Sequence, residues 1–303
     1  MPAIRRAQAD SQSHDCVVGR RHLRDATVGV RSLARVTDLT IDRSRAPALP
    51  GRRTLLAALA AAAVLPALGR RAGAQSEGLA ERTVDYPVAG GRCAGLLVHQ
   101  AALAKMPAIV VVPETSGAVS CTRLARRLAR QGYMVFVPSF VTLYGSPDDK
   151  AARTKLNNLT PANVTALIRS AIDFLAAQPQ SSGTVALVAL GWGAAGCAAI
   201  AADPGPVKAL VLFYMAPPTG EQIPAIKVPL QLHYAALDER TMALVEPAER
   251  KLMGHSKVYE QYVYEGQTAS FMNEQTDRKV DDAVVALAFD RMEFFLARYV
   301  KPR

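Results

Sequence analysis

Residues 184–196 read TVALVALGWGAAG, and this stretch decides the fold. Its first seven residues are apolar except for Thr184, and a short continuous run of this kind is typical of a strand buried on both faces. Small residues follow, and the alanine-rich segment from Cys197 to Ala202 favours a helix. The stretch therefore predicts a buried strand that turns sharply into a helix through a corner built of small residues.

Strands and helices are predicted to alternate on both sides of this corner. Strands are expected over 82–88, 92–98, 108–112, 133–137, 184–190, 209–213, 229–234 and 258–264. Helices are expected over 122–131, after Thr160-Pro161, over 197–202, before His255 and along the apolar stripe at 285–299, with a polar loop at 139–159. The first two strands are expected to form an antiparallel hairpin. The pattern predicts a single-domain α/β fold with a mostly parallel sheet of about seven or eight strands, covered by helices on both faces.

The basic charge of the chain lies in its amino-terminal part. The 303 residues carry a formal net charge of +10, and residues 1–74, with 13 arginines, no lysine and five aspartates, account for +8 of it. The remaining residues carry a net charge of only +2. A nucleic-acid-binding protein would be expected to concentrate basic side chains in its folded part. The charge distribution therefore argues against nucleic acid as a partner.

Residues 52–74 have the layout of an export signal. Arg52-Arg53 precedes an apolar run that ends at Leu68, and a small-residue cleavage site follows at Ala74. We interpret this segment as a twin-arginine-type signal peptide, which predicts an exported, periplasmic protein that engages the export machinery. The alternative is an uncleaved membrane anchor, although an apolar run of about 15 residues is short for a bilayer. Residues 1–51 are interpreted as a disordered extension or as the product of a misassigned start codon.

Three cysteines fall in the predicted domain at 75–303, namely Cys93, Cys121 and Cys197. Their spacing matches no metal-binding pattern, so we predict no metal site and no cofactor. In an exported protein Cys93 and Cys121 could form a disulfide, and buried free thiols are the alternative.

The functional site of an open parallel sheet lies beyond the carboxyl ends of its strands. Four strand ends carry candidate residues. They are Glu114, the turn Gly191-Trp192-Gly193, Asp238 and the segment 265–273. We expect these residues to lie together at one edge of the sheet.

In this order the four segments resemble the dienelactone hydrolase family of the α/β-hydrolase superfamily. Val112-Pro113-Glu114 is similar to the family's segment with a glutamate after the third strand. The sequence ALGWGA at 189–194 is similar to the elbow G-[FWY]-C-[FWL]-G-G, and Asp238 stands where the family has its acid. The sequence YEGQTASFMN at 264–273 is similar to Y-P-G-A-x-H-x-F-x-N. The resemblance covers nearly all of residues 82–300 and implies an α/β-hydrolase fold that acts on lactones or esters.

Two positions depart from the family pattern. Gly191 stands at the nucleophile position, or Gly193 if the register is shifted by two residues, and Ala269 stands at the histidine position. The family's reaction needs a cysteine thiolate that attacks the carbonyl carbon and a histidine that transfers protons. By this comparison Asp238 and Glu114 are retained. Since loss of a nucleophile costs on the order of a million-fold in turnover in another hydrolase, we predict a degraded catalytic site.

Other residues of the predicted site could still bind a ligand. The resemblance implies that the backbone amides of Trp192 and Thr115 form the oxyanion site. The indole of Trp192 could line a ligand pocket or pack against the loop at 139–159. Ser116 lies close to Glu114 in the sequence, and these two residues are the candidates for a non-standard catalytic group.

The predicted domain offers no clear replacement for the missing groups. Cys197 is expected in the core, and none of His99, His233 and His255 falls in the family's catalytic segment. The leading hypothesis is a non-catalytic protein that binds a small ester, lactone or carboxylate. The alternatives are a hydrolase that uses a loop hydroxyl, a carboxylate or a polarised water, and a purely structural role in a periplasmic assembly.

Overall fold

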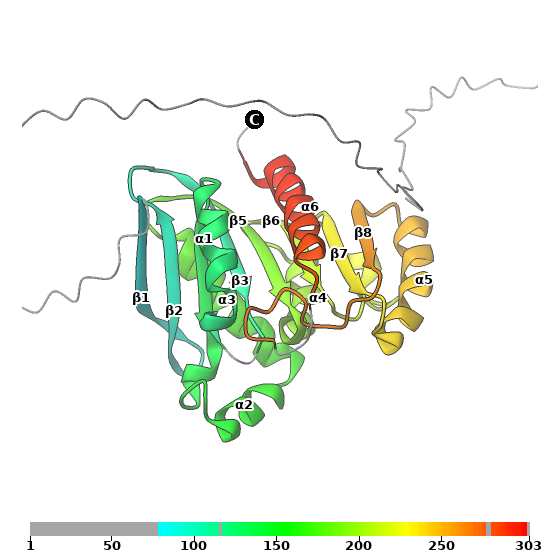
Figure 1. Ribbon diagram of the computed structural model, residues 1–303, viewed down its shortest axis with the longest axis horizontal. Helices are drawn as coiled ribbons and strands as arrows, with labels where there is room; N and C mark the ends of the chain where they lie inside the picture. Colours follow the sequence, from blue (N-terminus) through cyan, green and yellow to red (C-terminus); the bar gives the residue numbers. More distant parts are fainter. Residues whose placement is uncertain (1–77, 115–116, 277–279, 302–303) are drawn as a thin grey trace, which may run out of the picture. The chain divides into compact units, whose positions relative to one another are not determined.

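A computed structural model describes residues 78–114, 117–276 and 280–301. These residues form an eight-stranded sheet in the order β1-β2-β4-β3-β5-β6-β7-β8 (Figure 1). The strand β2 runs antiparallel to both of its neighbours, and all other pairs are parallel. The mostly parallel α/β fold is therefore confirmed. The interpretations of residues 1–51 and 52–74 concern segments outside the described residues.

The observed strands lie at the predicted places. They are β1 (Leu79–Val88), β2 (Gly91–Gln100), β3 (Met106–Val112), β4 (Met134–Ser139), β5 (Ser181–Leu190), β6 (Val207–Phe213), β7 (Leu230–Ala235) and β8 (Tyr259–Tyr264). The strands β3, β4 and β7 are buried along their whole length. Burial on both faces explains the nearly continuous apolar runs of β3 and β4. In β7 the two buried polar side chains, Gln231 and His233, hydrogen-bond to each other.

Helices cover both faces of the sheet. They are α1 (Thr122–Arg130), α2 (Lys150–Asn157), α3 (Pro161–Ala176), α4 (Ala194–Ala202), α5 (Glu239–Gly254) and α6 (Asp282–Val300). Buried side chains of α1 and α6 pack on one face of the sheet, and those of α2 to α5 pack on the other (Figure 1). In the described part of the chain, no helix combines the length and the apolar character needed to cross a membrane.

The prediction of a continuous loop at 139–159 is wrong, because α2 lies within it. The Asp149 side chain accepts a hydrogen bond of 2.7 Å from the backbone nitrogen of Ala151 and caps the helix. Ala152 and Leu156, spaced by one helical turn, are buried. These signals are present in the sequence, but the polar and charged residues between them hide the short apolar face.

The disulfide alternative for Cys93 and Cys121 is also wrong in this structure, where both cysteines are free and buried. Cys93 lies in the core on one face of the sheet, and Cys121 lies in the core on the opposite face. The sheet therefore separates the two thiols.

The corner after β5 depends on the small size of its residues. An ideal Cβ atom added at Gly193 would lie 2.5 Å from Cγ1 of Val112 on β3. One added at Gly196 would lie 2.9 Å from the backbone nitrogen of Thr165 on α3. Both positions are thus closed to larger side chains, so α4 can pack against β3 and α3 only at glycine.

We predict that Gly193→Ala destabilises the protein by about 1–3 kcal/mol, because the new methyl group overpacks the contact with the buried, branched Val112. The φ angle of Gly193 is −61°, which alanine adopts without strain, so the substitution isolates the steric effect. Urea unfolding of the full-length chain measures the change.

The matched control for this prediction is Gly254→Ala. An added Cβ at Gly254, the last residue of α5, meets no atom within 4 Å, so its stability is expected to stay within about 0.5 kcal/mol of the wild type. Equal effects of the two substitutions would contradict the close approach at the corner.

Candidate functional site

The site is built around Gly191, the first residue after β5. Its φ angle is +52°, in the left-handed region that favours glycine, whereas Gly193 has the helical value of −61°. The sharp reversal of the backbone therefore falls on Gly191, at which a nucleophile elbow would place its reactive residue. At this position the chain has a hydrogen atom in place of a side chain.

Two side chains from other strands flank Gly191. An ideal Cβ atom there would lie 3.3 Å from Cγ of Glu114, which follows β3, and 3.6 Å from Cε2 of Tyr214, which follows β6. Oε2 of Glu114 accepts a hydrogen bond of 3.0 Å from Nδ2 of Asn273. Residues from three strand ends thus converge on the corner, as expected for the carboxyl edge of a parallel sheet.

Tyr214 was missed by the sequence analysis. Its φ angle is +40°, which is strained for a residue other than glycine, and its side chain is buried. Burial and the charge of Glu114 hold the pKa of Tyr214 well above its ordinary value, so its hydroxyl stays protonated. The available signal was its place directly after the apolar run of β6, at the same sheet edge as the other candidates.

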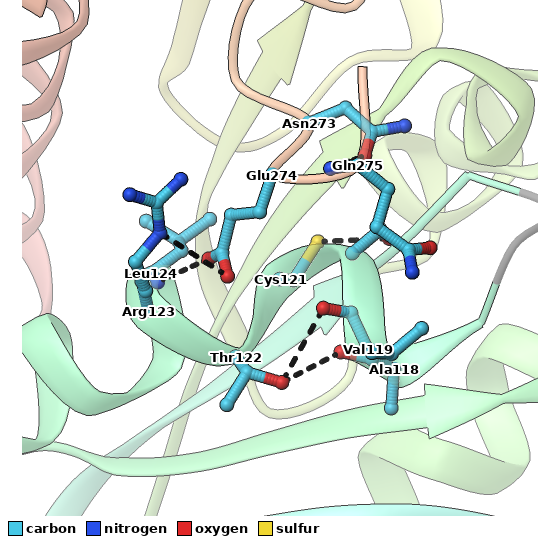
Figure 2. A network of polar contacts seen from close by, with 10 residues as sticks. Ala118, Val119, Cys121, Thr122, Arg123, Leu124, Asn273, Glu274 and Gln275 are labelled. Carbon is cyan, nitrogen blue, oxygen red and sulfur yellow. Dashed lines mark hydrogen bonds and ion pairs between the residues drawn. The ribbon is translucent and has the colours of Figure 1, made fainter. Parts of the chain in front are cut away.

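The segment that follows β8 is fixed to the start of α1 (Figure 2). Oε1 of Glu274 accepts a hydrogen bond of 2.8 Å from the backbone nitrogen of Leu124, and Oε2 lies 3.6 Å from Nε of Arg123. The backbone nitrogen of Glu274 donates to the carbonyl oxygen of Ser120 at 3.0 Å. A carboxylate is stabilised at a helix amino terminus, so these contacts hold the neighbouring Asn273 close to Glu114.

Asp238 lies beside the segment that contains Ala269. The backbone nitrogen of Leu237 donates to the carbonyl oxygen of Gln267 at 3.0 Å, which places the two segments side by side. Oδ1 of Asp238 accepts a hydrogen bond of 3.2 Å from the backbone nitrogen of Thr241 and caps α5. Among the described residues no imidazole hydrogen-bonds to Asp238, so its observed contact is that of a helix cap.

Of the other predicted binding residues, the structure describes Trp192 only. The indole of the partly buried Trp192 faces the ring of Phe140, with centroids 6.0 Å apart, so it packs against the segment 139–159. Thr115 and Ser116 lie outside the described residues.

His233 is a core residue of β7. One ring nitrogen lies 2.7 Å from the hydroxyl of Tyr264, the other lies 2.9 Å from Oε1 of Gln231, and the ring stacks on Phe213. Burial, reinforced by the charge of Arg291, holds the pKa of His233 well below its ordinary value. With both nitrogens occupied, this imidazole cannot serve Asp238 or the corner.

The thiols near the corner, Cys121 and Cys197, are buried and free. Cys197 is buried in α4, where its Sγ donates to the carbonyl oxygen of Gly193 at 3.2 Å, and burial raises its pKa to about 12. Burial likewise raises the pKa of Cys121 to about 12. Since the thiolate is the reactive form of cysteine, neither buried thiol is suited to act as a nucleophile. The described residues also contain no group of three or more side chains suited to hold a metal ion.

The sheet order and the sharp corner after β5 define a domain of the α/β-hydrolase type. The family model described as the dienelactone hydrolase family matches residues 93–300. This chain belongs to that family. None of the curated proteins matches it.

Solved structures of similar fold come from several sources. A protein of Klebsiella pneumoniae subsp. pneumoniae MGH 78578 named as a dienelactone hydrolase is 20% identical, with a TM-score of 0.64, and the match covers 73% of this chain and 99% of the other. The dienelactone hydrolase-like promiscuous phosphotriesterase P91 from metagenomic libraries is 21% identical, with a TM-score of 0.62 and coverage of 74% and 100%. The dienelactone hydrolase from Anabaena variabilis is 15% identical, with a TM-score of 0.60 and coverage of 74% and 100%. At these identities the likeness shows the fold alone.

Proposed function

We propose that this protein binds a small ester, lactone or carboxylate at the former active site of a dienelactone hydrolase fold and does not hydrolyse it. The observation that carries the proposal is Gly191, which keeps the left-handed backbone of a nucleophile elbow without a reactive side chain. Ala269 at the histidine position supports it, because alanine cannot transfer a proton. Glu114 and Tyr214 supply polar atoms at the corner that a bound ligand could contact.

The expected loss of catalysis is large. In another hydrolase, removal of the nucleophile alone reduces turnover on the order of a million-fold, which corresponds to about 8 kcal/mol of transition-state stabilisation. The oxyanion amides that the family resemblance assigns to Trp192 and Thr115 would remain, but they stabilise a charge that forms only after attack on the carbonyl carbon. Binding without turnover is therefore the function that best fits these residues.

We predict that the purified full-length chain hydrolyses p-nitrophenyl acetate and γ-butyrolactone no faster than buffer. The reason is the absence of a nucleophile at Gly191 and of a base at Ala269. Release of p-nitrophenol and of acid, followed by spectrophotometry and pH-stat titration, measures the two rates.

The alternative is an active hydrolase that uses Glu114 and Ser116. The position of the Glu114 side chain beside Gly191 favours this alternative over other possible enzyme mechanisms. Turnover well above buffer that disappears in Glu114→Ala or Ser116→Ala would establish this alternative and contradict the binding proposal.

We further propose that residues 52–74 act as a twin-arginine-type export signal and that the protein works in the periplasm, with an uncleaved membrane anchor as the alternative. The paired arginines, the short apolar run and the small residues before Gln75 support export. Amino-terminal sequencing of protein from the periplasmic fraction is expected to begin at Gln75. Intact, membrane-bound chain would indicate the anchor.

A further inference from the structure

The two edges of the sheet carry different side chains. The edge strand β1 has three charged residues, Glu81, Arg82 and Asp85, and a proline, Pro87. Charges and prolines at an edge keep other strands from pairing with it. At the opposite edge β8 reads YEQYVY, with Glu260 as its single charged residue (Figure 1). The strand β8 is therefore an edge strand without the protection that β1 has.

Every second residue of β8 directs its backbone polar groups away from β7. The carbonyl oxygens of Val258 and Tyr264 accept hydrogen bonds of 3.0 and 3.1 Å from backbone nitrogens of β7 and of the residue that follows it. Bonds to one neighbour in a parallel ladder come from alternate residues, so Gln261 and Val263 direct their N–H and C=O groups outward. Among the described residues β8 has no strand on that side. Such a row of backbone groups is a template for another strand.

One face of α6 flanks this edge. The guanidinium carbon of Arg291 lies 4.1 Å from the ring centroid of Tyr262. Nη1 of Arg298 donates a hydrogen bond of 2.9 Å to Oε1 of Glu260. Both arginines therefore lie along β8 and place positive charge beside its one carboxylate.

Apolar side chains at the same place are exposed. Leu287 and Phe294 are three or four residues from these arginines and share their face of α6. Phe294 is 67% exposed, and Val263 on β8 is 39% exposed. Aromatic side chains and arginine are enriched in the surfaces through which proteins associate. The composition of this edge is thus that of an interface.

We propose that β8 pairs antiparallel with β8 of a second copy of this chain, around a twofold axis at Tyr262. The outward backbone groups of Gln261 in one copy and Val263 in the other then exchange hydrogen bonds. The axis generates the same bonds a second time. Such an isologous pair is closed, so it joins the two sheets into one and leaves no free edge at β8.

The charges along the edge fit a second copy. About an axis at Tyr262, Glu260 of one copy lies opposite Tyr264 of the other. The guanidinium carbon of Arg291 lies 5.3 Å from the ring centroid of Tyr264, so each Glu260 faces Arg291 of the second copy. Complementary charges of this kind select the partner and the register. Tyr262 faces its own symmetry mate, and aromatic cross-strand pairs stabilise antiparallel strands.

Sedimentation equilibrium of the full-length chain tests the pair over about 1–100 µM, the range of weak specific association. The mass is expected to reach twice the chain mass of 32.4 kDa. Val263→Lys places a charge at the edge and is expected to raise the dissociation constant at least about tenfold. Val263→Pro removes an outward N–H group, which an edge strand tolerates, and it keeps the test decisive if Val263→Lys does not fold. Circular dichroism checks the fold of each variant.

The matched control is Leu103→Lys. Leu103 is 40% exposed, as Val263 is, and it lies between β2 and β3, away from β8 in the strand order. This variant is expected to dimerise as the wild type does.

Single cysteines locate the axis. In a Cys16→Ser background, whose three remaining cysteines are buried, Tyr262→Cys is expected to form a disulfide-linked dimer under mild oxidation. Residues that face each other without backbone hydrogen bonds have Cα atoms about 4.5 Å apart, which a disulfide can bridge. Gln261→Cys is the control, because Gln261 lies opposite Val263 in the proposed register and forms no such link.

Several outcomes would overturn the inference. They are a monomer at the highest concentration, a dimer that survives both Val263 variants, dissociation by Leu103→Lys, and growth beyond the dimer. A crosslink through Gln261→Cys in place of Tyr262→Cys would also overturn it. If residues 1–77 or a different protein cover the edge instead, the purified chain stays monomeric, which contradicts the pairing of two copies.

Discussion

The close approach of backbone at the corner after β5 is the constraint on which the rest of this structure depends. Gly193 lies against Val112 of β3, and Gly196 lies against the backbone of α3 at Thr165, so neither position has space for a side chain. Because the packing is this tight, the chain must reverse within a few residues, and Gly191 takes the left-handed conformation that makes the reversal possible. The same contacts fix α4 against the central strands.

The candidate site follows from that corner. In an active α/β-hydrolase the strained position holds the nucleophile, and packing energy elsewhere in the fold compensates for the strain. Glycine at position 191 takes this left-handed conformation without strain. The polar groups that remain at the corner, Glu114 and Tyr214, come from neighbouring strand ends, and Asn273 fixes the first of them. The fold thus presents polar side chains around a corner that has glycine at position 191.

Much of the fold could be predicted from the sequence because buried parallel strands need continuous apolar runs. Capping residues also act locally, and Thr160-Pro161 starts α3 as expected, with the Thr160 hydroxyl 3.3 Å from the backbone nitrogen of Asn163. The helix α2 was missed, because its apolar face consists of only two buried residues among charged ones. Distances between residues far apart in the sequence could not be predicted either. That the sheet separates Cys93 from Cys121 is visible only in the three-dimensional structure.

The site was predictable where a motif marks a strand end and unpredictable elsewhere. Glu114 and the turn at Gly191 stand beside clear turn residues, so the sequence places both at strand ends, where the structure also has them. Tyr214 has no such mark, since an aromatic residue after an apolar run is usually read as part of the core. For Asp238, a helix cap and a catalytic acid occupy the same place at the end of a strand, and only its bond to the Thr241 nitrogen shows which contact is made.

The central claim is that the corner presents bare backbone in place of a reactive group. Its most direct measurement treats the native full-length chain with a fluorophosphonate and with iodoacetamide, and maps the adducts by mass spectrometry. The account predicts no adduct at the serines or cysteines of residues 78–301, Ser116 included, until the protein is unfolded. Rapid, stoichiometric modification of one such residue in the folded protein would contradict it.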